Sequence, residues 1–287
     1  MESQDLDVNY NRWGNIMENR ILKLNPFYSE KIWGYEQWTL STHKNGHCKI
    51  KDSDTTLINY IGKELPILNK IIKANDTLSV QVHPNDEFSR KHENDNGKTE
   101  CWYILEAEEN STLVCGIKKG HTKETLAKVI ETGDIEKHLK KISVKPGDMI
   151  YIPVGTVHAI EGGLKLIEVQ QSSDVTYRMY DWGRDREVHI EKYLEVIDYE
   201  GKNKGGKIEN FTKLETPYFT VEKIDVKDIY KDTVNDEDFH SYTVINGNGI
   251  IESCGESLEL VKEDTIYIPK GIEYNIAGQL ELLKSYV

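Results

Sequence analysis

The stretch Lys145–Glu168, KPGDMIYIPVGTVHAIEGGLKLIE, decides the fold of this chain. Pro146-Gly147-Asp148 and Glu161-Gly162-Gly163 are turn signals that frame short runs rich in β-forming residues. These runs predict three strands, at Met149–Pro153, Val157–Ile160 and Leu164–Val169. Short strands joined by tight turns are typical of a β-sandwich or jelly roll.

The same stretch has a counterpart near the C-terminus. Lys262–Lys284, KEDTIYIPKGIEYNIAGQLELLK, aligns with it without a gap after a shift of 116 positions. The shift places Ile150-Tyr151-Ile152-Pro153 on Ile266-Tyr267-Ile268-Pro269. We interpret the match as an internal repeat, so that the chain holds two copies of one β unit. His158 is an exception, because the second copy has Tyr274 in its place.

Length and composition are those of an ordinary soluble protein. The chain has 287 residues, enough for one large or two medium domains, and a net charge of −13. That charge argues against nucleic acid and anionic membranes as partners. The acidic start, MESQDLDVNYNRWGN, is no signal peptide, and the four cysteines form no C-x-x-C pair. We therefore expect a cytoplasmic protein with reduced thiols, as a monomer or homodimer.

The rest of the chain predicts a mainly β protein with two domains. Residues 1–20 are expected to form an arm or a short helix, and residues 86–97 a polar loop. Helical spacing predicts a small helical insertion over residues 123–141, interrupted at Gly133-Asp134. The polar connection over residues 193–206 ends in GKNKGG, a plausible linker. We therefore divide the chain into two domains, residues 1–205 and residues 206–287.

Four polar residues on predicted strands are candidate metal ligands. Gln81 and His83 share one strand face because side chains alternate along a strand. Glu100 shares a face with Trp102 and Ile104, and His158 lies on the strand after the Ile-Pro turn. Taken alone, His83 is better explained as a hydrogen-bonded histidine and Glu100 as a salt-bridged glutamate, and His158 is compatible with a core histidine. Together, two imidazoles, a carboxylate and an amide oxygen suit a divalent metal, with Zn²⁺ first and Mn²⁺, Fe²⁺ or Co²⁺ as alternatives.

Four segments resemble a class I mannose-6-phosphate isomerase of the compact bacterial type, a protein of two cupin domains. They are LSVQVHPND at Leu78–Asp86, GKTEC at Gly97–Cys101, GDMIYIPVGTVHAI at Gly147–Ile160 and SDVTYRMYDWGR at Ser173–Arg184. The resemblance covers roughly residues 20–287, and the helical insertion matches in place and length. It implies two cupin-type β jelly-roll barrels, a catalytic metal-binding domain over residues 1–205 and a degenerate C-terminal domain without metal over residues 206–287. One departure is Thr99, where longer family members commonly have proline.

The resemblance also implies roles for particular residues. Gln81, His83, Glu100 and His158 match the family's zinc ligands. Arg178 matches its catalytic arginine. Polar positions that line the family's substrate pocket are matched by Lys98, Glu168 and Asp174. On this basis the protein is expected to interconvert mannose 6-phosphate and fructose 6-phosphate in carbohydrate metabolism.

Aldose–ketose isomerisation suits these residue types. A proton moves between C1 and C2 through an enediol-type intermediate, and no redox cofactor is required. Zinc would polarise the two oxygens, and the permanent charge of Arg178 suits an enediolate or a phosphate. Lys98 is a candidate acid/base or phosphate partner, and Glu168 a candidate second proton carrier. Without the resemblance, a surface Arg178 paired with Asp181 and a solvated Lys98 would be the favoured interpretations.

Two other functions remain open. Two histidines and a carboxylate also make the facial site of a non-haem oxygenase, although Gln81 would leave less room for O₂. A non-catalytic cupin that binds a sugar is the second alternative, and Lys98 and Arg178 beside the metal argue against it. We expect one Zn²⁺ per chain, since Tyr274 and Lys284 in the second copy are poor metal ligands.

Overall fold

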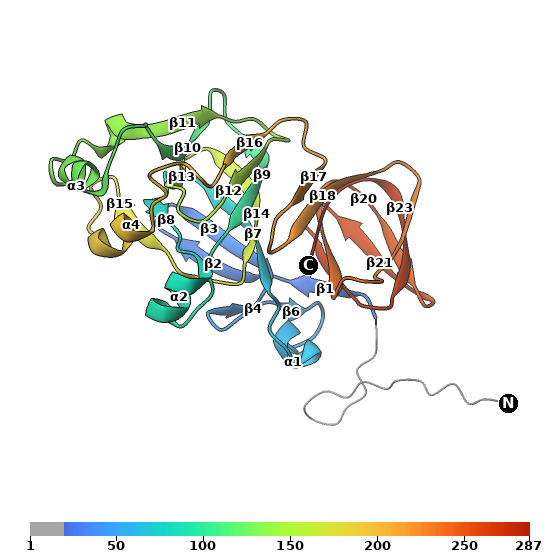
Figure 1. The fold of residues 1–287 in the computed structure, drawn as a ribbon. Coiled ribbons are helices and arrows are strands. Elements are labelled where there is room, and N and C mark those ends of the chain that lie inside the picture. The colour runs from blue at the N-terminus through green and yellow to red at the C-terminus, as the bar shows by residue number, and fades with distance from the viewer. Residues whose placement is uncertain (1–19) are drawn as a thin grey trace. The chain divides into compact units, whose positions relative to one another are not determined.

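The computed structural model describes residues 20–287, whose contacts divide into two compact units (Figure 1). The large unit comprises Tyr28–Trp38 and Ile67–Phe219, and the small unit comprises residues 20–27, Thr39–Pro66 and Thr220–Val287. Two early segments of the chain thus group with the C-terminal repeat. The division into residues 1–205 and 206–287 stays our proposal for how the two repeats are distributed. The predicted arm or short helix lies, apart from Arg20, outside the described residues.

The large unit is a sandwich of two sheets. One sheet has seven strands in the order β16 (Gly206–Ile208), β12 (Met149–Ile152), β9 (Glu100–Ala107), β14 (Leu164–Gln171), β7 (Ile67–Ala74), β3 (Gly34–Leu40) and β2 (Phe27–Lys31). The other has five, in the order β11 (Leu139–Ser143), β10 (Thr112–Ile117), β13 (His158–Ile160), β8 (Val80–Val82) and β15 (Tyr177–Tyr180). The short strand β17 (Lys213–Glu215) follows β16 in the chain.

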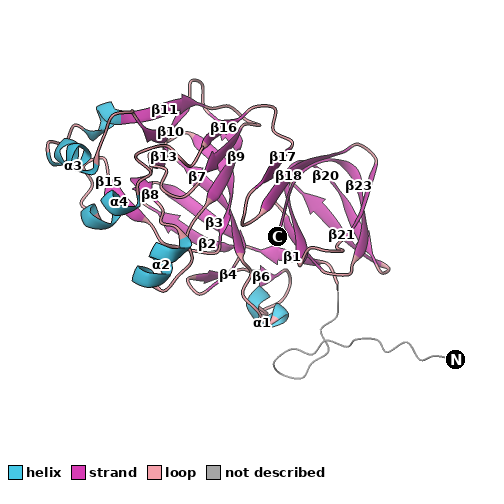
Figure 2. Ribbon diagram, in the orientation of Figure 1, coloured by secondary structure: helices cyan, strands magenta, loops and turns pink. Residues whose placement is uncertain are grey.

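The core of the large unit lies between the two sheets. Trp102 and Ile104 of β9 pack there with Leu113 of β10 and Ile160 of β13. Val80 and Val82 face the opposite way and pack under helices α3 (Lys123–Glu131) and α4 (Ile190–Val196). The alternation along β8 therefore turns its two valines outward and leaves Gln81 to face the interior. This arrangement confirms the prediction of a mainly β protein (Figure 2).

Helices are few, and three segments differ from the sequence-based expectation. The predicted polar connection over residues 193–206 begins within helix α4, where Tyr193 and Leu194 are buried. The predicted loop over residues 86–97 contains helix α2 (Asp86–Glu93), because the side chain of Asn85 caps the backbone N–H of Phe88. In the helical insertion, α3 is followed by a 3₁₀ turn, η1 (Ile135–His138), and then by β11. Residues 139–141 are therefore strand, and the expected helical restart is wrong there. None of the described helices is long and apolar enough to span a membrane.

The small unit is built on one main sheet. Its order is β18 (Thr220–Val226), β23 (Glu273–Tyr286), β20 (Phe239–Ser253), β22 (Thr265–Pro269), β1 (Leu22–Asn25) and β6 (Lys49–Ile50). β19 (Ile229–Thr233) pairs with β23, and β21 (Glu256–Val261) pairs with β20. Helix α1 (Leu57–Ile61) and the hairpin of β4 (Thr42–His43) and β5 (Gly46–His47) complete it. Its core includes Tyr242, Tyr274 and Leu282.

Strand register supports the internal repeat residue by residue. In the large unit Ile150 pairs with Trp102, and in the small unit Ile266, 116 positions later, pairs with Tyr242. Glu168 pairs with Trp102, and Lys284, 116 positions later, pairs with Tyr242. The two copies therefore share their cross-strand neighbours as well as their sequence pattern.

A lysine–aspartate pair also recurs at the start of each copy. Asp148 receives the ammonium of Lys207 from β16 at 2.7 Å, and Asp264 receives that of Lys23 from β1. Lys207 lies opposite Ile150, and Lys23 lies opposite Ile266. The N-terminal strand β1 thus takes the place in the small unit that β16 takes in the large unit.

Candidate metal centre and substrate cavity

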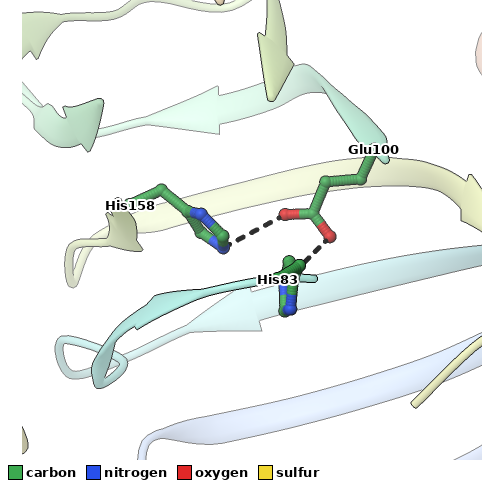
Figure 3. Close-up of side chains that lie close together, drawn as sticks. All are labelled: His83, Glu100 and His158. Atoms are coloured by element: carbon green, nitrogen blue, oxygen red, sulfur yellow. Dashed lines mark ion pairs between the residues drawn. The ribbon is translucent and has the colours of Figure 1, made fainter. Parts of the chain in front are cut away.

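Three strands of the large unit bring two imidazoles and a carboxylate together (Figure 3). His83 directly follows β8, Glu100 begins β9 and His158 begins β13. The His83 Nε2 atom lies 3.5 Å from Glu100 Oε2, and the His158 Nε2 atom lies 3.3 Å from Glu100 Oε1. All three side chains are buried, with at most 1% of each exposed. Residues far apart in the sequence therefore form one enclosed group.

Backbone carbonyls fix the tautomer of both histidines. His83 Nδ1 lies 2.8 Å from the carbonyl oxygen of Val175, and His158 Nδ1 lies 2.8 Å from that of Thr156. A carbonyl only accepts, so each Nδ1 carries the hydrogen and each Nε2 keeps a lone pair toward Glu100. Burial lowers the pKa of His83 to about 3 and also lowers the pKa of His158, so both rings stay neutral. Neutral, oriented imidazoles are the form that binds metals.

The carboxylate of Glu100 lacks hydrogen bonds although it is fully buried. Neither oxygen has a hydrogen-bond partner among residues 20–287. Burial raises the pKa of Glu100, but the Lys98 ammonium outweighs it and holds that pKa well below its usual range. An ionised carboxylate between two imidazole lone pairs is a donor set that suits Zn²⁺ or a similar divalent ion. The residues present therefore fit a metal ion.

Gln81 lies beside this group. Its backbone pairs in register with His158 and with Arg178, and its amide nitrogen lies 3.2 Å from His158 Nε2. To offer its oxygen as a ligand, the amide would have to turn over, a change that exchanges two atoms of similar size. The structure thus brings all four predicted ligands together, with the amide of Gln81 in the other orientation.

A cavity of about 310 Å³ opens beside the group, within the large unit. All four residues expected to bind substrate line it: Lys98, Glu168, Asp174 and Arg178. Gln81 lines it too and connects it with the histidines. The ammonium of Lys98 lies 3.0 Å from Glu100 Oε2 and 3.2 Å from His83 Nε2. Lys98 is therefore a buried cation that touches the candidate metal ligands, and the solvated alternative is wrong.

Arg178 lies on β15, and its side chain is held by the segment that follows this strand and not by Asp181. Its Nη1 donates to the carbonyl oxygen of Glu187 at 2.6 Å, while Asp181 accepts from Arg184 at 2.9 Å and from Arg186 at 2.6 Å. The alternative interpretation, an Arg178–Asp181 surface pair, does not occur. Arg178 remains on the cavity wall together with Arg186.

Sequence reasoning missed several cavity residues. They are Lys31, Trp33, Glu36, Lys70, Ser79, Thr176 and Arg186, among others. Lys70 had a signal, since it is a lysine within the apolar run Ile67–Ile72 and is 3% exposed. A charged residue in a buried strand needs a partner, and Lys70 pairs with Glu168 at 3.2 Å. Arg186 lies two residues beyond the matched motif and carried no such signal.

The corresponding position in the small unit holds a different cluster. By register, Tyr274 replaces His158, His240 replaces Glu100 and Asp232 replaces Gln81. The Tyr274 hydroxyl bonds His240 Nδ1 at 2.7 Å, and the ammonium of Lys284 lies 2.8 Å from Asp232. A buried ammonium already neutralises Asp232, which disfavours a metal ion there.

Comparison with known proteins gives one family throughout. A model described as "Phosphomannose isomerase type I, catalytic domain" matches residues 8–103, and one described as "Mannose-6-phosphate isomerase, cupin domain" matches residues 207–287. The chain is 32% identical to mannose-6-phosphate isomerase ManA of Bacillus subtilis over 94% of this chain and 100% of that protein. It is 34% identical to mannose-6-phosphate isomerase of Streptococcus mutans over 88% of each.

Solved structures agree with this result. The mannose 6-phosphate isomerase from Bacillus subtilis superposes with a TM-score of 0.84 and 28% identity, covering 93% of this chain and 99% of that one. The mainly β architecture is thus of the cupin type that the sequence predicts.

Proposed function

Because this chain belongs to the type I mannose-6-phosphate isomerase family, we propose that it is a metal-dependent enzyme that interconverts mannose 6-phosphate and fructose 6-phosphate. The observation that carries the proposal is the buried His83–Glu100–His158 group beside a cavity with several cations. Imidazole and carboxylate ligands suit a Lewis-acid metal, and cations suit a phosphorylated sugar. The two features together match the chemistry of an aldose–ketose isomerase.

We assign the metal site to Gln81, His83, Glu100 and His158, with Zn²⁺ as the resident ion, one per chain. The support is the donor set: two neutral imidazoles whose Nδ1 atoms are bound to carbonyls, and a buried carboxylate whose oxygens have no hydrogen bond among the described residues. When bound there, zinc would supply Lewis-acid polarisation of the sugar's C1 and C2 oxygens. The carbonyls of Val175 and Thr156 would hold both rings in the required orientation.

Proton transfer between C1 and C2 falls to residues that face the cavity. Glu168 is a buried carboxylate on the wall, and burial together with Glu100 raises its pKa. A raised pKa brings a carboxylate closer to the operating pH, where a general base is most effective. Lys98 is the nearest cation to the metal ligands and would donate to an oxygen of the enediol-type intermediate. We propose that these two residues share the acid and base roles.

Arg178 and its neighbours would hold the charged parts of the substrate. Arg178 and Arg186 both line the cavity, and Lys31 lines it as well. A guanidinium presents paired donors that match phosphate oxygens or an enediolate. We assign Arg178 to stabilising the developing negative charge and Arg186 to the phosphate. Asp174, which is exposed on the same wall, would accept from a sugar hydroxyl.

The test is direct turnover. Purified protein is incubated with mannose 6-phosphate, and fructose 6-phosphate is measured with and without a chelator. We expect turnover that the chelator abolishes and Zn²⁺ restores. Oxygen uptake is recorded in parallel, because uptake without isomerisation would indicate the oxygenase alternative. Binding of the sugar phosphate without product would indicate a non-catalytic cupin, and full turnover by verified metal-free protein would refute metal dependence.

A further inference from the structure

Three adjacent strands surround the carboxylate of Glu168. On β14, Glu168 pairs in register with Trp102 of β9 on one side and with Lys70 of β7 on the other. All three side chains are buried, with 3% or less of each residue exposed. The carboxylate is thus flanked within the sheet by an indole and an ammonium.

The two oxygens of this carboxylate have different partners. The Trp102 indole N–H donates to Oε2 at 2.9 Å. Oε1 has no hydrogen-bond donor among residues 20–287, and its partner is the Lys70 ammonium in an ion pair at 3.2 Å. A buried carboxylate oxygen without a hydrogen bond is costly, so its retention calls for an explanation. Because Glu168 lines the cavity, Oε1 is the oxygen left for a bound molecule.

Lys70 is itself held in place. Its ammonium lies 3.9 Å from Glu36 Oε2 and 5.0 Å from the centre of the Trp38 ring. Glu36 is fixed by the Trp38 indole N–H, which donates to Oε2 at 2.8 Å. Lys70 therefore lies between two carboxylates over an aromatic face, which keeps it charged and stationary.

We propose that Trp102 is a positioning residue for the isomerase reaction: its indole N–H clamps Oε2 of Glu168 and leaves Oε1 to exchange the proton with the sugar. This inference rests on the proposed function and deepens it. A carboxylate held at one oxygen cannot rotate about its terminal torsion, so Oε1 keeps one direction toward the cavity. Lys70, held by Glu36, maintains a cation beside Oε1 throughout. Fixing a reacting atom in this way lowers the entropic part of the reaction's activation free energy, since less conformational freedom is lost on reaching the transition state.

The small unit indicates that this arrangement serves the site and not the fold. At the positions of Trp102, Glu168 and Lys70, the second copy has Tyr242, Lys284 and Glu222. The same strand geometry thus forms without an indole, and without a carboxylate at the central position. Tyr242 is as deeply buried as Trp102, so burial alone does not require tryptophan.

The test is a double-mutant cycle with Trp102→Phe and Glu168→Gln. Phenylalanine keeps an aromatic ring but removes the N–H. We expect Trp102→Phe to lower kcat by roughly tenfold or more, as for loss of a hydrogen bond to a charged group, with KM and metal content close to wild type. In the Glu168→Gln background, Trp102→Phe should lower kcat no further, because the carboxylate it positions is gone. Tyr242→Phe, the matched change in the second copy, should leave kcat unchanged.

Several outcomes would overturn the inference. A wild-type kcat in Trp102→Phe, losses that multiply in the double variant, or a loss of metal that accounts for the lower rate would each do so. If Trp102→Phe does not fold, benzothienylalanine at position 102 replaces the N–H by sulfur at nearly constant shape and has the same expected result. Wild-type protein without turnover would instead refute the proposed function, which separates the two failures.

Discussion

Replacing Asp232 by asparagine should destabilise the small unit at neutral pH, and the effect should shrink as the pH falls from about 4 toward 2. Asp232 Oδ2 lies 2.8 Å from the ammonium of Lys284, whose side chain is 7% exposed. It also accepts from the Tyr230 hydroxyl at 2.8 Å. Burial alone would raise the pKa of Asp232, but these donors outweigh it and lower that pKa to about 2. The ionised carboxylate is thus stabilised in the folded state.

The magnitude follows from the difference between folded and unfolded pKa. An unfolded aspartate titrates near ~3.9, so the shift is about two pH units, or about 2.6 kcal/mol at most. Asp232 is 24% exposed, and solvent screening reduces the contribution to about 1 kcal/mol. Because the folded pKa is depressed, this stability is fully present above about pH 4 and is lost as the pH falls toward 2.

The assay must report on the small unit alone. The described tryptophans, at positions 33, 38, 102 and 182, all lie in the large unit, so their fluorescence does not follow unfolding of the small unit. Hydrogen exchange of backbone amides in β19 and β23, measured from pH 7 to pH 3, gives the required free energies. Asp232→Asn should differ from wild type by about 1 kcal/mol at pH 7, and the difference should shrink below pH 4. A difference that is absent at pH 7, or that grows on acidification, would refute the reasoning.

Three further predictions concern the metal and the cavity. Metal analysis should give about one Zn²⁺ per chain. This ratio should fall close to zero in His158→Ala and stay unchanged in Tyr274→Phe and His240→Ala. A ratio near two that falls on changing His240 would contradict the assignment. Arg178→Lys should keep the fold and the metal but lower kcat by roughly tenfold or more, because lysine lacks the planar donor fork. If the variant turned over like wild type, the role of Arg178 would be structural only. Adding Zn²⁺ to metal-free protein, at about 100 times the Kd for Zn²⁺, should stabilise the large unit by about 2.7 kcal/mol. Denaturant titrations followed by tryptophan fluorescence measure this change. Equal unfolding midpoints with and without zinc would speak against a metal site in the large unit.

Period-two alternation within single strands was enough to predict much of the site. Along residues 80–83 it places Gln81 and His83 on one face, and in the structure the two valines that alternate with them pack outward under the helices. The same argument placed Glu100 with Trp102, and both are buried. Local pattern determines which face a side chain takes, and polar residues on an inward face indicate a site.

Contacts between distant strands could not be predicted in this way. The pair of Lys70 with Glu168 depends on the register of β7 against β14, which lie about a hundred residues apart in the chain. A period-two pattern fixes faces but leaves the register between two remote strands open. Helix α2 was missed for a local reason, since its polar composition hid the cap at Asn85. The grouping of β1 with the C-terminal repeat likewise depends on long-range pairing with β22.

The two copies show how one scaffold separates stability from chemistry. Both place a charged residue in the middle of a buried strand, with an oppositely charged residue opposite it: Glu168 with Lys70, and Lys284 with Glu222. The signs at these two register positions are reversed between the copies while the strand register is conserved, and the ammonium of Lys284 is neutralised by Asp232 at 2.8 Å. Folding therefore requires that the central charge be compensated, and it does not require a particular sign. On the proposed function the sign would decide the chemistry, because a central carboxylate could accept a proton beside the proposed metal site, whereas a central ammonium would repel a metal ion.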